Sequence, residues 1–339
     1  KVDFNAKIAK KIQQEFNLSQ ILSELIVSRN FSENEIYLIE NNLELSNIFK
    51  KNQDFIKSSE LLEIAIKNKE KICILGDYDV DGSAATSLWI KFLKSINHPH
   101  FHYIPDREQD GYGASKKIFE KLIQDKPKLI IMVDCGSTSL EAINYLNENN
   151  IKSLVIDHHE IPKPFPKANV IINPKKDNGY IEYDYLCATT LTYFFLDILI
   201  RKIKCKINLR KYLIYVLLAT VCDVMPMRKL NRLIAITALE EFDINENIAF
   251  KELYKLTNKK NKINIDDLGF LIGPILNSGG RLGKSGYAVD LLSSEDHKVI
   301  TKKSLELLEL NNKRKKIEHN IIKNIDFDKI EKENKNIIL

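Results

Sequence analysis

Short runs of apolar, often β-branched residues alternate with longer amphipathic stretches through the middle of the chain. The short runs have the length and residue types of β-strands, and we predict strands at 71–75, 100–104, 128–133, 152–156 and 169–172. The stretches between them are long enough for helices, at about 83–96, 114–124 and 138–149. Strands that alternate with helices favour a parallel sheet covered on both faces. We therefore predict the α/β class, with a doubly wound, mainly parallel sheet.

The pattern on either side of this region is helical. Apolar residues recur at helical spacing before the sheet, as at Ile21, Leu22, Leu25 and Ile26. From about Asp184 onward nearly every segment is helical, with helices expected at 191–203, 210–220, 230–241 and about 295–325. These shifts divide the chain into an N-terminal helical segment at 1–69, a sheet domain at 70–225 and a helical connector at 226–334.

Three of the predicted strands end directly at acidic residues. The residues that follow them are Asp77, Asp79 and Asp81 after 71–75, Asp134 after 128–133, and Asp157-His158-His159 after 152–156. Because parallel strands place their carboxyl ends at one edge of the sheet, we expect these side chains to converge. Crowded carboxylates raise one another's pKa unless a multivalent cation neutralises them, and imidazoles add further ligand atoms. The pattern predicts a divalent metal site.

Two simpler interpretations of the segment Asp77–Gly82 compete with the metal site. Its D-x-D-x-D-G pattern is also how a calcium-binding EF-hand loop begins, but that loop needs a bidentate acid at its twelfth position, where this chain has Leu88. Aspartates after strands also serve as helix N-caps. Capping explains one acid, whereas three acids in one segment together with a His-His pair favour a metal site.

Composition limits the classes of protein to consider. The 339 residues are 29% charged, and no apolar stretch approaches the roughly 18 residues of a membrane span, so we predict no membrane partner. The five cysteines contain no C-x-x-C pair and lie mostly in apolar segments, which is typical of reduced thiols and predicts a cytoplasmic protein. The net charge of +5 permits a nucleic-acid partner without requiring one.

Four motifs in this order resemble those of the DHH phosphoesterase superfamily and, within it, of the RecJ-type exonucleases specific for single-stranded DNA. They are Asp77-Tyr78-Asp79-Val80-Asp81-Gly82, Val133-Asp134-Cys135-Gly136, Asp157-His158-His159 and Val221-Cys222-Asp223-Val224-Met225-Pro226. Further RecJ-like segments are Ile104-Pro105-Asp106-Arg107, Ile172-Asn173-Pro174, Asn231-Arg232 and Gly279-Gly280-Arg281. The resemblance implies that residues 70–225 form a metal-binding DHH catalytic domain.

The resemblance also implies which residues form the site. It implies two divalent cations, with Mn²⁺ preferred over Mg²⁺ because the ligands mix carboxylate and imidazole. The ligands of one ion would be Asp77, Asp79 and Asp134, and those of the other Asp81, Asp134, His158 and Asp223. The implied catalytic residues are Asp79, Asp81, Asp134, His158, His159 and Asp223, with His159 contacting the phosphate or orienting His158. Arg107 and Arg281, each in a glycine-containing loop, are expected to bind a substrate phosphate.

Three positions depart from the family pattern. Leu75 stands where some members have a histidine, Ile275 where an arginine is usual, and Ala188-Thr189-Thr190 where a glycine-rich turn is usual. The first departure leads us to expect that one metal depends on Asp77 or on water instead. The other two put substrate contacts in question and leave the metal acids intact.

The function implied by the resemblance is metal-dependent phosphodiester hydrolysis, by a five-prime-to-three-prime exonuclease on single-stranded DNA in repair and recombination. The alternatives are a DHH-family oligoribonuclease or cyclic-dinucleotide phosphodiesterase, and a non-catalytic RecJ-like replication scaffold, against which the intact acids argue. Single-stranded DNA is the implied partner, and the resemblance admits a single-strand-binding protein and a helicase. RecJ-like proteins continue into a second lobe, DHHA1, and we expect the apolar run at 335–339 to begin a truncated copy of it.

Overall fold

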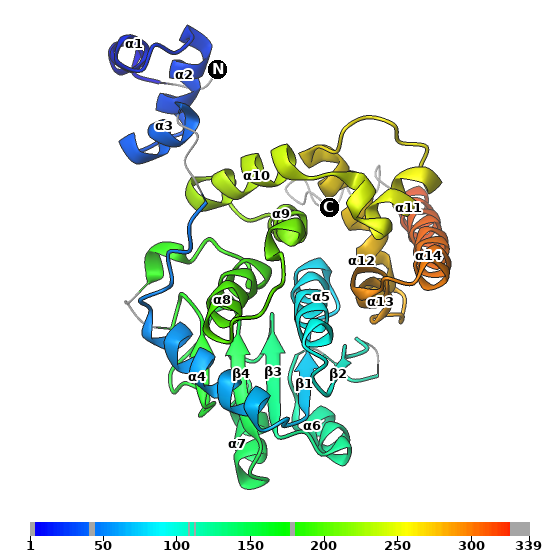
Figure 1. Cartoon of the computed structure of the whole chain (residues 1–339). Coiled ribbons are helices and arrows are strands. Elements are labelled where there is room, and N and C mark those ends of the chain that lie inside the picture. The colour runs from blue at the N-terminus through cyan, green and yellow to red at the C-terminus, as the bar shows by residue number, and fades with distance from the viewer. Residues whose placement is uncertain (1–3, 41–44, 108, 112, 177–179, 326–339) are drawn as a thin grey trace.

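Five parallel strands form one sheet in the middle of the described chain. The computed structural model describes residues 4–40, 45–107, 109–111, 113–176 and 180–325, so the strand start expected at 335–339 lies outside the described residues. The strands are β1 (Ile72–Leu75), β2 (His100–Tyr103), β3 (Leu129–Val133), β4 (Lys152–Ile156) and β5 (Val170–Ile172). Every neighbouring pair is parallel, in the order β2-β1-β3-β4-β5 (Figure 1). The predicted α/β class is confirmed.

The strand order indicates where the ligand crevice of the sheet lies. The chain adds β2 on one side of β1 and then crosses to add β3, β4 and β5 on the other side. In sheets of this kind the ligand crevice lies at the carboxyl ends of the strands, where the order reverses. Asp77 follows β1 and Asp134 follows β3, so two of the predicted metal acids lie on either side of this reversal.

Helices cover both faces of the sheet, because the buried strands present apolar side chains to each of them. On one face Ile74, Ile131 and Leu154 pack with helices that include α5 and α8, and α4 lies beside α8 and β5. On the other face Cys73, Ile130 and Val155 pack with α6 and α7. The bounds are α4 (Gln53–Lys67), α5 (Val80–Ser95), α6 (Lys116–Leu122), α7 (Leu140–Glu148) and α8 (Ala188–Lys202).

The remainder of the described chain is helical. α9 packs against α5 and α8, and α9 and α10 lie beyond the carboxyl ends of the strands (Figure 1). The chain then returns to α5 through α12 and α13, which also pack on the long helix α14. The bounds are α9 (Leu213–Cys222), α10 (Lys229–Glu241), α11 (Ile248–Leu256), the π-helix η5 (Asp267–Ile272), α12 (Gly273–Arg281), α13 (Tyr287–Ser293) and α14 (His297–Lys323). Single 3-10 turns are η1 (Ile123–Asp125), η2 (Ile181–Tyr183), η3 (Leu209–Tyr212) and η4 (Ile244–Glu246).

The N-terminal helices form a small unit of their own. α1 (Ala6–Glu15), α2 (Gln20–Ser28) and α3 (Glu33–Glu40) surround a separate core of Phe16, Ile26 and Ile36, apart from the sheet (Figure 1). α3 packs on α10, where the Arg228 guanidinium is bonded to both carboxylate oxygens of Glu35, at 2.7 and 2.8 Å. The helices expected before the sheet are therefore present. None of the described helices is both long and apolar enough to pass through a bilayer.

Two differences from the sequence prediction matter for the site. α5 begins at Val80 rather than at 83, so that Asp81 lies in the first turn of the helix. The predicted helices did not include α11, α12, α13 or the π-helix η5. These elements pack against α14, α5 and the end of α9.

Candidate metal centre

The loop between β1 and α5 carries the first group of acids. Asp79 is the N-cap of α5, because its carboxylate accepts a hydrogen bond of 3.0 Å from the Gly82 amide. The capping interpretation therefore applies to this residue. Gly82 packs against the backbone of Asp77, and a Cβ there would lie 2.5 Å from the Asp77 nitrogen. The loop thus folds back tightly on the first turn of the helix.

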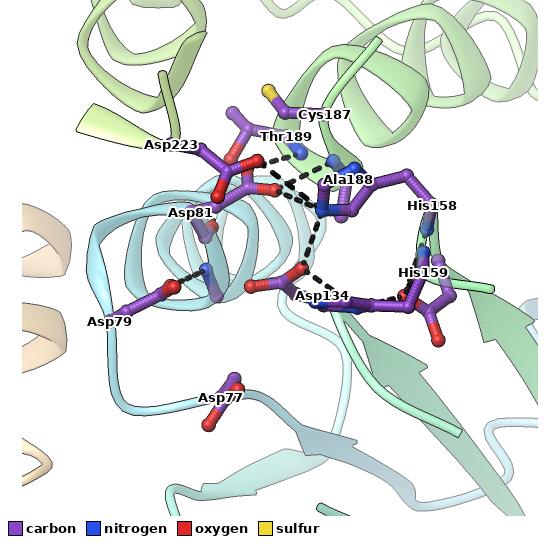
Figure 2. A network of polar contacts seen from close by, with 12 residues as sticks. Asp77, Asp79, Asp81, Asp134, His158, His159, Cys187, Ala188, Thr189 and Asp223 are labelled. Atoms are coloured by element: carbon purple, nitrogen blue, oxygen red, sulfur yellow. Dashed lines mark hydrogen bonds and ion pairs between the residues drawn. The ribbon is translucent and has the colours of Figure 1, made fainter. Parts of the chain in front are cut away.

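Asp134 and His158 meet at the ends of two neighbouring strands. The Asp134 amide donates to the Ile156 carbonyl at the end of β4, and Asp134 has a left-handed backbone with φ of 61°. This conformation is uncommon for residues other than glycine, although Asp and Asn tolerate it better than most. His158 Nε2 lies 3.3 Å from Asp134 Oδ1 (Figure 2). Both side chains are almost fully buried.

Asp223 reaches the same point from a helix end far along the chain. It is the C-cap of α9, and its Oδ2 lies 3.4 Å from His158 Nε2. Asp81 Oδ2 lies 3.7 Å from the same nitrogen. His158 is therefore the centre of a cluster of Asp81, Asp134 and Asp223, which Figure 2 shows converging from separate elements.

The hydrogen-bonding state of this cluster fits a divalent cation. Four of its buried atoms have no hydrogen-bond partner among the described residues: both carboxylate oxygens of Asp134, His158 Nε2 and Asp223 Oδ2. Buried polar atoms are otherwise almost always paired, so an unpaired set aimed at one point calls for a ligand. Two groups of atoms are close enough to hold an ion, namely Asp81, His158 and Asp223, and Asp134, His158 and His159. Asp77 and Asp79 belong to neither group.

Burial and mutual repulsion disfavour the charged forms of these acids. Burial, followed by the charge of Asp79, raises the pKa of Asp77 to about 7. Burial and the charges of Asp81 and Asp79 raise the pKa of Asp223 to about 7 and that of Asp134 well above its usual range. Burial also lowers the pKa of His158, which keeps the imidazole neutral and able to ligate. A cation at this point would relieve the repulsion.

Asp81 is held by hydrogen bonds from the start of α8, which no sequence pattern predicted. The backbone amides of Ala188 and Thr189, at the start of α8, donate to its two carboxylate oxygens at 2.7 and 2.8 Å. The Thr189 hydroxyl also donates to the Asp81 carbonyl at 2.9 Å. The departure from a glycine-rich turn at 188–190 therefore lies beside a proposed metal ligand, which it contacts mainly through its backbone. The other two departures, Leu75 and Ile275, are buried core residues.

The role of Asp157 was not predicted from the sequence, although the residue belongs to the Asp157-His158-His159 motif. Its Oδ1 accepts hydrogen bonds from the amides of His158 and His159 and lies 2.8 Å from His159 Nδ1. Its Oδ2 accepts from the Ser137 amide. These donors hold the pKa of Asp157 well below its usual range despite burial, and the bond to Asp157 raises the pKa of His159 to about 9. Asp157 therefore orients the two histidines, and it belongs to neither group of atoms close enough to hold an ion.

The structure brings both predicted phosphate-binding arginines to Tyr78, within the acidic loop. The Arg107 guanidinium carbon lies 5.8 Å from the centre of the Tyr78 ring. Gly280 packs against the same residue, since a Cβ there would lie 2.6 Å from the Tyr78 carbonyl oxygen. Arg281 follows it as an exposed side chain in the last turn of α12, so the expectation of a glycine-containing loop at this position was wrong. Both arginines counteract the rise that burial causes in the pKa of Tyr78.

Comparison with known proteins identifies the family. The sequence pattern of the DHH family, N-terminal domain, matches residues 71–220. The chain is 27% identical over 312 residues to the single-stranded-DNA-specific exonuclease RecJ of Bacillus subtilis, covering 91% of this chain and 39% of that protein. It is 30% identical over 269 residues to RecJ of Haemophilus influenzae, covering 76% of this chain and 47% of that protein. The chain thus spans less than half the length of these curated relatives.

Solved structures share the fold. RecJ from Thermus thermophilus in complex with Mn²⁺ superposes with a TM-score of 0.80 at 20% identity, over 95% of this chain and 46% of that one. An exonuclease RecJ bound to manganese superposes with a TM-score of 0.73 at 23% identity, over 84% of this chain and 70% of that one. At these identities the likeness establishes the fold alone. The family assignment comes from the matched domain and the RecJ relatives, which show that residues 71–220 are a DHH family, N-terminal domain.

Proposed function

We propose that this chain is a metal-dependent phosphodiesterase that removes nucleotides from the five-prime end of single-stranded DNA. The observation that carries the proposal is the buried set of unpaired ligand atoms on Asp134, His158 and Asp223, at the switch point of the sheet. The names of the RecJ relatives supply the substrate class. The proposal extends to its cellular role: the chain acts in DNA repair and recombination in the cytoplasm, with a single-strand-binding protein and a helicase as partners.

The proposed site holds two divalent cations, with Mn²⁺ preferred. Asp77, Asp79 and Asp134 would hold one, and Asp81, Asp134, His158 and Asp223 the other. When bound, such a pair lowers the pKa of a water molecule and stabilises the charge on a scissile phosphate and its leaving oxygen. The number of carboxylates suits this role, because two dications offset the repulsion that raises the pKa values of Asp77, Asp134 and Asp223.

His159 is proposed to contact the phosphate directly. Its Nδ1 lies 2.8 Å from Asp157 Oδ1, which leaves Nε2 as the ring nitrogen for another partner. In the metal-free protein the bond to Asp157 raises the pKa of His159 to about 9, which favours the protonated ring with Nε2 as a donor. A cationic donor of this kind forms a strong hydrogen bond to a phosphate oxygen.

The experiment that tests the proposal is digestion of end-labelled substrates by the purified chain with Mn²⁺, Mg²⁺ or a chelator. We expect metal-dependent release of nucleotides from the five-prime end of single-stranded DNA, faster with Mn²⁺, and no release with the chelator. Single-stranded RNA, short oligoribonucleotides and a cyclic dinucleotide serve as the competing substrates. Preference for one of these would replace the DNA assignment, and an inert chain that binds neither metal nor DNA would contradict the proposal.

Arg107 and Arg281 are proposed to hold the terminal phosphate, which would set the direction of digestion. Replacing either with alanine removes a charged hydrogen bond of about 1.5–3 kcal/mol. We expect kcat/KM on five-prime-phosphorylated DNA to fall roughly 10- to 100-fold, with a smaller loss on DNA that has a five-prime hydroxyl. Arg201→Ala is the matched control, because Arg201 is an exposed arginine paired with Asp197 within α8. Equal losses on the two ends would rule out this role.

A further inference from the structure

A groove lined by two arginines lies beside the metal centre and extends beyond the residues proposed to hold the metals and the terminal phosphate. It is a hollow of about 140 Å³ between η5, α12, α14 and the end of α9. We call it the η5 groove; its lining includes Cys222, Gly269, Gly273, Asn277, Arg281 and Arg314. Figure 1 shows α12 beside α14, and the two helices are in contact.

The groove lies next to the acidic cluster, because one of its lining residues is Cys222. Cys222 directly precedes Asp223, and its thiol donates to the Leu268 carbonyl in η5 at 3.7 Å. Gly273 closes the same junction, because a Cβ at this position would overlap the Cys222 sulfur. The π-helix is therefore seated on the turn of α9 that presents Asp223, which places the groove beside this proposed metal ligand.

The two arginines give the groove the charge that a phosphate backbone requires. Arg314 is held in place, with its Nε 3.2 Å from Asn311 Oδ1 and its Nη1 2.9 Å from Glu318 Oε2. Asn311 is itself buried in α14, so the position of the guanidinium is defined. Arg281 lines the same groove as an exposed side chain and is the arginine proposed above to hold the terminal phosphate.

Phe270 supplies an exposed aromatic side chain in η5, one of the elements that line the groove. Its side chain is 83% exposed, although its neighbours Leu268 and Ile272 are fully buried. It follows the groove residue Gly269 in a π-helix, a rare element that is frequently found at functional sites. Proteins that bind single-stranded nucleic acid combine a basic groove with aromatic rings on which bases stack. An exposed phenylalanine that directly follows a groove residue, in an element that helps to line a groove with two arginines, matches that combination.

We propose that the η5 groove binds the stretch of single-stranded nucleic acid adjacent to the scissile phosphate, with Arg314 contacting a backbone phosphate and Phe270 stacking on a base. This inference rests on the proposed function, because it assigns a strand-binding site to the same nuclease. It adds two residues, Phe270 and Arg314, that are outside the metal and terminal-phosphate sets. Both are positioned to bind the strand rather than to act on the bond that breaks.

The stacking role is tested by the affinity of Phe270→Ala for a fluorescent oligothymidylate, measured by anisotropy in chelator so that no hydrolysis occurs. Loss of one stacked base is expected to weaken binding by roughly tenfold. Phe270→Trp should restore it. On a strand whose bases are replaced by an abasic tract, Phe270→Ala and the unmodified chain should bind equally. Tyr37→Ala, at a half-exposed aromatic residue in the N-terminal unit, is the control.

The phosphate contact proposed for Arg314 is tested by the salt dependence of DNA binding. Arg314→Gln should reduce the slope of log affinity against log salt by about 0.7, the value for one phosphate contact on a single strand. Phe270→Ala should leave that slope unchanged, because stacking releases no counterions. Arg201→Gln, which disrupts a similar ion pair within a helix, is expected to change neither affinity nor slope. Unfolding temperatures of all variants establish that each is folded.

The outcomes separate this inference from the proposed function. If the unmodified chain hydrolyses and binds DNA while Phe270→Ala and Arg314→Gln bind it with unchanged affinity and slope, the groove assignment is wrong and the nuclease proposal stands. An equal loss for Phe270→Ala on the normal and abasic strands would also overturn the stacking role. Binding by the unmodified chain without any metal-dependent hydrolysis, with both variants impaired as expected, would support the groove and reject the catalytic proposal.

Discussion

Replacing Asp134 with asparagine is expected to abolish metal-dependent hydrolysis while preserving the fold. Asp134 is proposed to ligate both cations, and loss of its charge should remove several kcal/mol of transition-state stabilisation. We expect kcat/KM to fall roughly a thousandfold or more. Asparagine is preferred to alanine because it has nearly the same shape and also tolerates the left-handed backbone of this position, where φ is 61°. Calorimetric titration with Mn²⁺ measures the accompanying loss of metal affinity.

The same substitution should stabilise the metal-free protein at neutral and higher pH. The pKa values of Asp77 and Asp223 are raised to about 7 in the folded state, from the ordinary value of 3.8, and that of Asp134 is raised as well. The folded state therefore binds more protons than the unfolded state between about pH 4 and 7, and the free energy of unfolding falls as pH rises through that window. Asp134→Asn removes one of these groups, so the fall should be smaller.

A surface aspartate provides the control for Asp134. Asp125 is exposed and pairs with Lys71, which directly precedes β1 and so lies at the opposite end of this strand from the site. Asp125→Asn should therefore leave turnover and metal affinity unchanged, and the dependence of stability on pH should also stay the same. Near-normal turnover by Asp134→Asn would contradict the shared-ligand assignment. Loss of turnover with undiminished Mn²⁺ binding at both sites would place Asp134 outside the ligand set.

Gly82→Ala is expected to reduce both stability and activity, even though alanine is a better helix former than glycine. The new Cβ would lie 2.5, 2.6 and 2.7 Å from the nitrogen, carbonyl oxygen and Cα of Asp77. Backbone atoms cannot rotate away, so the loop or the helix must shift, at a cost of about 2–3 kcal/mol. We expect the unfolding temperature to fall by roughly 4–8 °C. A displacement of Asp77 approaching 1 Å would lower turnover about 100-fold.

Gly286→Ala is the matched control for this steric argument. Gly286 also lies at the start of a helix, its φ is negative, and a Cβ there would meet no atom within 4 Å. Its substitution should therefore leave the unfolding temperature and turnover nearly unchanged. An unfolding temperature for Gly82→Ala as high as that of the Gly286 variant would show that the loop accommodates the methyl group, and the proposed tight contact with Asp77 would be wrong.

The strands were the most predictable part of the fold. β1, β3 and β4 lie within a residue of their predicted ranges because each is a short apolar run bounded by polar residues. The convergence of Asp134 and His158 also followed from the sequence, since strand ends meet at one edge of a parallel sheet. The helices α11, α12 and α13 were missed, and so was η5, because turn residues and glycines interrupt the apolar pattern of this region.

The roles within the site depended on contacts between distant segments. Asp157 and Asp134 both follow apolar strands, yet Asp157 is occupied by the amides of His158, His159 and Ser137 while Asp134 has unpaired oxygens. No local pattern distinguishes them. The donors that hold Asp81 come from the start of α8, over a hundred residues away, through backbone amides that carry no sequence signature.

The α/β class, the positions of the strands, and the acids and histidines at their ends could all be predicted from the sequence. They are predictable because strand patterns and strand-end positions are local properties of the chain. The folded chain shows which of those groups are unpaired and which are held by hydrogen bonds, and it brings Arg107 and Arg281 to Tyr78 in the loop after β1. The physical reason is that pairing, burial and mutual repulsion depend on distances between residues far apart in the chain, and these exist only after it has folded.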